Sequence, residues 1–159
     1  LKSGPGSSDV AIAPQGMSAT IYLADDAKDR RDKIAAHLRA DERIGGVYAG
    51  EEMRELGLDP DDGIDIVVVG LSSEAMGEGG LPGVGHAFQG DLKIANNIGC
   101  GQHGGLGKYE QSPFLICVGA GFAAGDEIAD KTSPIDIAPT AMRHLGLDED
   151  GMDGRALQR

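Results

Sequence analysis

The sequence predicts a mixed α/β fold that carries a small α+β unit in its first sixty residues. Short β-branched runs at residues 18–23 and 64–69 are typical of strands, and a charged stretch with a narrow apolar face at residues 27–39 is typical of a helix. The later part of the chain contains most of the 26 glycines, which indicates long loops and tight turns around few regular elements.

The elements expected in the first sixty residues alternate between strand and helix. Asp25 and Asp26 are candidate N-caps for the first helix, and Gly57 is expected to stop the second, since glycine readily ends helices. Turn-forming residues at 59–63 mark a boundary, so residues 1–60 are expected to form one domain and residues 61–159 another. The expected elements are strands at residues 10–13, 18–23 and 46–48 and helices at residues 27–39 and 51–56.

Beyond this boundary the pattern predicts two strands and one helix. Residues 64–69 (Ile-Asp-Ile-Val-Val-Val) are apolar enough for burial on both faces of a sheet, and residues 114–118 (Phe-Leu-Ile-Cys-Val) predict a second buried strand. Residues 70–105 hold no long element, and a glycine-rich segment of this length is typically a functional or a disordered loop. Asp136 is expected to cap a helix that ends at Gly146.

The charge of the chain restricts its partners. The formal net charge is −12, and a surface this acidic repels phosphate backbones, so nucleic acid is not expected as the main partner. A small phosphorylated substrate remains compatible with it, because bound divalent cations dominate the local field. We expect no membrane span, since the sequence has no apolar run of about 20 residues. With two cysteines and no signal peptide pattern, a reducing cytoplasm is the expected compartment.

His103 is the strongest candidate for a metal ligand. It stands in Gly101-Gln102-His103-Gly104-Gly105, where glycines let the backbone approach closely and present the imidazole from a tight loop. A Cys-x-x-His spacing with Cys100 suggests zinc, but a structural zinc site needs four ligands and no second pair is present. His86, in the long loop, is a candidate to face the substrate. His37 and His144 are expected to be surface residues of helices.

Several motifs in order carry a family resemblance over residues 98–157. Residues 101–105, Glu110 and the segments that follow resemble the last metal-binding loop, closing helix and tail of the type I phosphodiesterase/nucleotide pyrophosphatase family, in the alkaline phosphatase superfamily. Ala120 replaces the proline usual in that family, and residues 18–69 resemble its cap-like insertion more loosely. The motifs that carry the match are residues 101–105, 113–116, 119–122, 135–140, 145–147 and 152–155.

The resemblance implies an alkaline-phosphatase-like fold whose cap-like unit is residues 1–60 and whose core, with the last metal-ligand loop, is residues 61–159. It implies a two-metal site, with zinc or alternatively manganese, in which His103 holds one ion. Glu110, Gln111 or Ser112 is expected to orient His103 without binding the metal itself, and the sequence leaves the choice among the three open. The implied substrate is a small phosphorylated molecule, and the implied reaction is hydrolysis of a phosphoester bond.

The family's other site residues are missing from this sequence. The dinuclear site also needs an early Asp, a Thr or Ser nucleophile, an Asp-x-x-x-His pair and an Asp-His dipeptide, and none of the four histidines follows an Asp at either spacing. We therefore expect the nucleophile upstream of Leu1, in a missing N-terminal half of the same enzyme, and an isolated chain without activity. The alternative is a non-catalytic acidic binding or interaction module.

Overall fold

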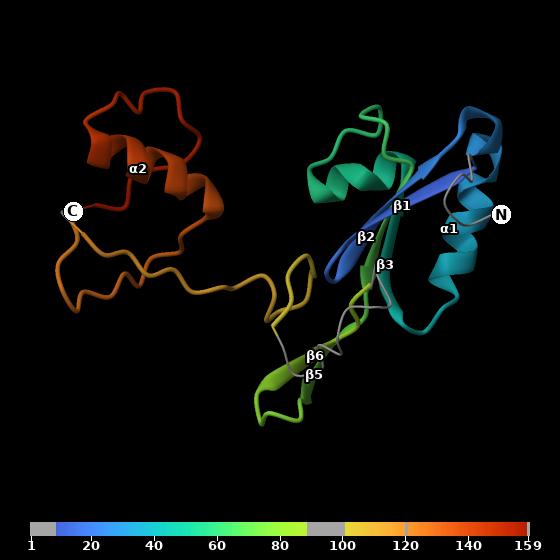
Figure 1. The fold of residues 1–159 in the computed structure, drawn as a ribbon, viewed down its shortest axis with the longest axis horizontal. Helices are drawn as coiled ribbons and strands as arrows, with labels where there is room; N and C mark the ends of the chain where they lie inside the picture. The colour runs from blue at the N-terminus through green and yellow to red at the C-terminus, as the bar shows by residue number, and fades with distance from the viewer. Residues whose placement is uncertain (1–8, 89–100, 120, 159) are drawn as a thin grey trace. The chain divides into compact units, whose positions relative to one another are not determined.

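A computed structural model describes residues 9–88, 101–119 and 121–158 of the chain, and it shows an α+β fold with antiparallel sheets (Figure 1). The chain divides into two compact units, residues 1–113 and residues 114–159, which are considered separately below. Cys100 and Ala120, named above for their motifs, lie outside the described residues.

The first unit is built on a four-stranded sheet in the order β1-β2-β4-β3, with every neighbouring pair antiparallel. A 3-10 helix, η1 (Asp25–Arg30), and the helix α1 (Arg31–Arg39) connect β2 to β3, while β4 lies between these two strands. The connection is therefore a split β-α-β unit, in which the strand from later in the chain fills the central gap. The strands are β1 (Val10–Gln15), β2 (Ser18–Leu23), β3 (Ile44–Ala49) and β4 (Ile66–Gly70).

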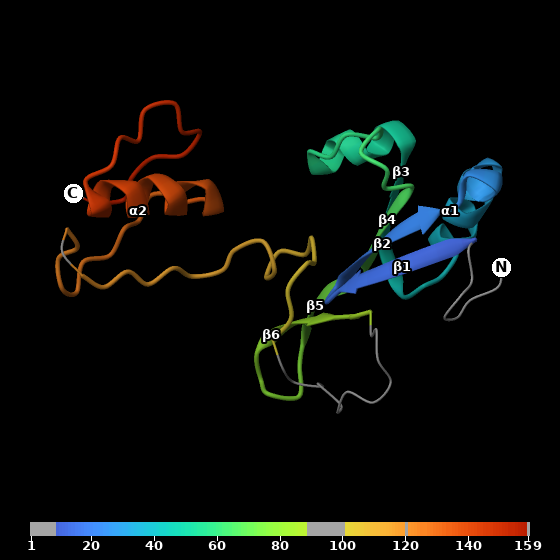
Figure 2. The same cartoon turned by 45° about the horizontal axis from the view of Figure 1, so that its top comes forward.

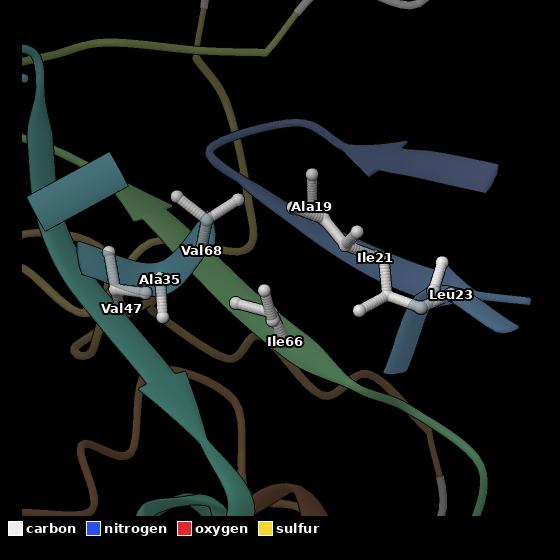
Figure 3. Close-up of a cluster of buried hydrophobic side chains, with 8 residues drawn as sticks. Ala19, Ile21, Leu23, Ala35, Val47, Ile66 and Val68 are labelled. Carbon is white, nitrogen blue, oxygen red and sulfur yellow. The ribbon is translucent and has the colours of Figure 1, made fainter. Parts of the chain in front are cut away.

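One face of this sheet packs against η1 and α1 to form the core (Figure 3). Alternate residues of β2 point to the helices, as the two-residue period of a strand requires. Ala27 and Ala35, which are almost completely buried, bring the helices close to the sheet because their side chains are small. The buried cluster consists of Ala19, Ile21, Leu23, Ala27, Ala35, Val47, Ile66 and Val68.

The central strand β4 is buried on both faces, as the sequence predicts for this run, although it begins at Ile66. Ile66 and Val68 face the helices, and Val67 and Val69, which alternate with them, are also buried. The 3-10 helix η2 (Gly50–Leu56) lies next to β3 and β4 and buries Met53. Since β4 belongs to the same sheet as β1–β3, the first compact unit continues past the boundary expected at residue 60.

The start of the first helix differs from its prediction. Neither Asp25 nor Asp26 is the N-cap; that position is Ala24, which has no side chain able to cap. The first turn is a tight 3-10 helix, closed by a 2.8 Å hydrogen bond from the Ala27 N–H to the Ala24 carbonyl. The second helix ends as expected, with Gly57 in the left-handed conformation at φ 74°.

A short hairpin, β5 (Ser72–Met76) and β6 (Pro82–Gly85), lies within the segment for which the sequence predicts no long element (Figure 2). The strands are short and largely exposed, so the hairpin has no alternation of buried and exposed residues that a sequence pattern could reveal.

The second unit contains a 3-10 turn, η3 (Pro134–Asp136), and the helix α2 (Ile137–Leu145), which Gly146 ends at φ 68°, as predicted. Asp136 is the residue before α2, but its side chain does not cap that helix. The prediction of a buried strand at residues 114–118 is wrong. This segment is coil, and the side chains of Phe114 and Val118 are 87% and 94% exposed. An apolar run predicts burial, but burial needs a neighbouring element, and no described strand pairs with it.

Candidate metal-ligand loop

The loop that contains His103 rests on the turn between β1 and β2. The His103 loop (residues 101–111) accepts a 2.8 Å hydrogen bond at the His103 carbonyl oxygen from the Met17 N–H. Gly16 lies against the His103 carbonyl oxygen, and Gly104 lies against the Gln15 carbonyl oxygen. Both glycines have positive φ angles, 74° and 85°. A side chain at Gly104 would overlap the Gln15 carbonyl oxygen, so only glycine allows this close approach.

The same turn binds the two other segments around the site. The Phe88 N–H donates to the Gly16 carbonyl oxygen at 2.7 Å, and the Gly70 N–H donates to the Met17 carbonyl oxygen at 2.8 Å. The segment with His86 and the loop with His103 are therefore both anchored at one end of the sheet by backbone hydrogen bonds. Both imidazoles are exposed to solvent, so each is accessible to a ligand.

Glu110 occupies the inside of the His103 loop. Its Oε1 accepts a hydrogen bond from the Ser72 hydroxyl at 3.3 Å, and its Oε2 is buried without a hydrogen-bond donor among the described residues. The Gln111 side chain donates from Nε2 to the Gly105 carbonyl oxygen at 2.8 Å, which closes the loop. Glu110 and Gln111, two of the three residues expected to support His103 as a ligand, thus stabilise its loop by side-chain hydrogen bonds.

The described residues do not form a metal-ligand group by themselves. Among residues 9–88, 101–119 and 121–158, no three His, Cys, Asp or Glu side chains gather in a group that could hold a metal ion. A zinc site needs three or four ligands, so the His103 imidazole would need ligands from outside these residues to hold an ion.

His37, His144 and Asp136 lie on or next to the helices of the two units. His37 is exposed on α1, and His144 is exposed in the last turn of α2, as expected. Asp136 is buried, and its two carboxylate oxygens accept backbone N–H groups from Arg155 at 3.0 Å and from Ser133 at 2.9 Å. These bonds, first that from Arg155, hold the pKa of Asp136 below its usual range. Asp136 therefore fastens the tail to the start of α2.

Comparisons with known proteins return nothing for this chain: no family model, no curated protein and no solved structure matches it. In the part of the chain that the structure describes, no helix has both the length and the apolar character that crossing a membrane requires.

Proposed function

We propose that this chain is the C-terminal portion of a metal-dependent phosphodiesterase or nucleotide pyrophosphatase with an alkaline-phosphatase-like core. The observation that carries the proposal is the presentation of His103. Its backbone is fixed at the end of a sheet while its imidazole stays exposed, which is the arrangement a ligand needs before an ion arrives. The ordered motifs downstream of His103 support the same assignment.

In this proposal the chain contributes one imidazole and the surroundings of a two-metal site. When bound, two divalent ions, zinc or manganese, supply charge stabilisation and an activated hydroxide for hydrolysis of a phosphoester. His103 holds one ion as a neutral imidazole, and the hydrogen bond at its carbonyl oxygen keeps its loop in place. His86, anchored at the same turn, lies close to the phosphorylated small-molecule substrate.

The rest of the proposed site comes from outside these 159 residues. A Thr or Ser nucleophile and the Asp and His ligands of both ions belong to an N-terminal half of the same enzyme. The cap-like insertion of this proposal extends past residue 60, because β4 completes its sheet, and the core begins after that strand. The enzyme works in a reducing cytoplasm, without nucleic acid as its main partner and without a membrane partner.

A second candidate is a non-catalytic acidic binding module, which the net charge of −12 and the lack of a metal-ligand group among the described residues favour. The two candidates differ in what the complete gene product contains. An Asp, a Thr or Ser and an Asp-His dipeptide ahead of this segment support the enzyme, and a native start near Leu1 supports the module.

The test uses His103→Ala in the complete gene product. Turnover of a nitrophenyl phosphodiester should fall by about 100-fold or more. Mutation of a residue that only orients a metal ligand already lowers metal affinity or activity by about 10–100-fold. Metal content by elemental analysis should fall with it, while the fold survives because the side chain is exposed.

His37→Ala and His144→Ala are the matched controls, since both remove an exposed helical imidazole. Neither should change rate or metal content. Full metal occupancy and full rate in His103→Ala would overturn the proposed function.

A further inference from the structure

A carboxylate lies inside the His103 loop, next to the buried side chain of Met17. Leu106 and Tyr109, the large apolar residues of the loop, are 44% and 41% exposed. Glu110 instead folds back across its own loop, since a side chain at Gly105 would come within 2.9 Å of its Cγ and one at Gly107 would overlap its Oε2. The glycines at these two positions make the space that the carboxylate occupies.

Glu110 links the loop to the hairpin. The Ser72 hydroxyl, at the start of β5, donates to Oε1 at 3.3 Å. The N–H of Glu110 itself donates to the Gly107 carbonyl oxygen at 3.1 Å, so the carboxylate is carried on a closed turn. A movement of Ser72 or of this turn is thereby transmitted to the rest of the loop.

Met17 also contacts the loop, next to Glu110. Its N–H bonds the His103 carbonyl oxygen, and its side chain is buried beneath Gly105, where an added Cβ would come within 3.2 Å of the sulfur. Met17 and Glu110 therefore lie next to each other against Gly105, two residues after His103.

Burial of Oε2 without a described donor costs free energy, because a buried acceptor loses its hydrogen bonds to water. A methionine would fill similar space at no such cost, but it would leave the Ser72 hydroxyl without its acceptor. The carboxylate is therefore best explained by the link that it makes across the loop.

We propose that Glu110 is a positioning residue, which acts through Ser72 to hold the His103 loop against β5 and so fixes the direction of the His103 imidazole. Its effect on metal binding rests on the proposed function. Its effect on the loop does not, and the two are measured separately.

Hydrogen exchange of the Met17 amide in the 159-residue chain measures how firmly the loop is held, because this amide donates to the His103 carbonyl oxygen. In Glu110→Ala the exchange rate of this amide should rise by about tenfold or more, since the link to Ser72 is lost. The amides of Val67 and Val68 in β4 should keep their protection, which shows that the sheet is intact. Glu110→Gln keeps the acceptor for Ser72 and should recover most of the protection.

The matched control is Glu74→Gln. Glu74 also joins β5 to the loop, through a 3.3 Å ion pair with Lys108, but both side chains are exposed. An exposed pair contributes little, so the exchange of Met17 should stay within about twofold of the parent chain. If Glu110→Ala does not fold, Ser72→Ala removes the same hydrogen bond from the other side and is read in the same way.

The effect of Glu110 on metal binding is measured as the zinc affinity of the complete gene product. Glu110→Ala should weaken it by about tenfold or more, which is usual for residues that orient a ligand, and Glu110→Gln should restore it. Unchanged Met17 exchange in Glu110→Ala and Ser72→Ala overturns the proposal. So does unchanged zinc affinity in Glu110→Ala when His103→Ala weakens binding.

A third outcome separates the two proposals. If His103→Ala itself leaves zinc affinity unchanged, the proposed function fails, and the role of Glu110 in holding the loop is decided by the exchange of the Met17 amide alone.

Discussion

At the scale of single residues, two glycines determine how the candidate ligand is held. Gly16 and Gly104 both have positive φ angles, and each lies against the backbone of the other's segment. Their lack of a side chain lets the Met17 N–H reach the His103 carbonyl oxygen. The position of the His103 backbone thus depends on two residues that have no side chain.

Gly104→Ala should detach the loop. The new side chain would overlap the Gln15 carbonyl oxygen and would impose a strained φ, at a cost of about 1–3 kcal/mol in the free energy of unfolding. Urea unfolding of the chain and exchange of the Met17 amide measure the two effects. Gly101→Ala is the control, because an added Cβ there meets nothing within 4 Å; a cost equal to that of Gly104→Ala would contradict this account.

Asp136 gives the second unit a dependence on pH. The Arg155 and Ser133 N–H groups hold the pKa of its carboxyl below the usual range, so the charged form stabilises the folded tail. A depressed pKa in the folded state means that this stability is fully present above the unfolded value of about 3.9. It is lost as pH falls from there through the folded pKa.

The Arg155 amide should therefore lose its folded NMR signal position below about pH 4 and keep it at neutral pH. Asp136→Asn should remove this titration and weaken the tail at all pH values, because the amide nitrogen of asparagine cannot accept a hydrogen bond. Asp153→Asn, at an exposed turn position, is the control. A transition that persists in Asp136→Asn would assign it to another group.

At the scale of elements, the sequence predicts those that carry their own pattern. The strands at residues 18–23 and 66–70 and the helix α2 follow from β-branched runs, an apolar face and a terminal glycine. The β5–β6 hairpin has no such pattern, because most of its residues are exposed. The cap of the first helix was missed because Ala24 acts through its backbone alone.

The candidate site divides in the same way. The role of His103 as a ligand stays a prediction from its flanking glycines, and the structure shows only that its side chain is exposed. The contact of Glu110 with Ser72 joins residues 38 positions apart, which no local pattern reveals. Gly105 and Gly107 are the local feature that relates to this contact, because a side chain at either position would collide with Glu110. The sequence alone does not reveal this, since it does not show that the carboxylate folds back over the loop.

The apolar segment at residues 114–118 should make the isolated chain prone to association. Phe114, Ile116 and Val118 are largely exposed, and the segment has no charge and high β-propensity. Ile116→Lys should reduce concentration-dependent light scattering without lowering the melting temperature, since little buried area is lost.

Leu81→Lys serves as the control for this change, because Leu81 is exposed but lies outside an apolar run. Equal reduction of scattering by both variants would show that added charge alone, and not the segment, is responsible.

At the scale of the whole molecule, acidity and an incomplete ligand set act together. A net charge of −12 repels a phosphorylated substrate unless bound cations offset it, and no group of three possible metal ligands lies among the described residues. Under the proposed function, the described residues therefore need ligands from elsewhere to bind such cations.

The purified 159-residue chain should therefore show no turnover of a nitrophenyl phosphodiester with added zinc or manganese. The complete gene product, assayed in the same buffer, is the positive control. Metal-dependent turnover by the isolated chain that disappears in His103→Ala would place a complete site within these residues.

The turn between β1 and β2 also determines where the chain tolerates an insertion. Hairpin tips are usual places for epitope tags and circular permutation, because their backbone is free. Here the backbone groups of Gly16 and Met17 already bind three other segments, so added residues would separate all of them. The tip of the β5–β6 hairpin, where side chains at Gly79 and Gly80 would meet nothing within 4 Å, is the better place to open the first unit.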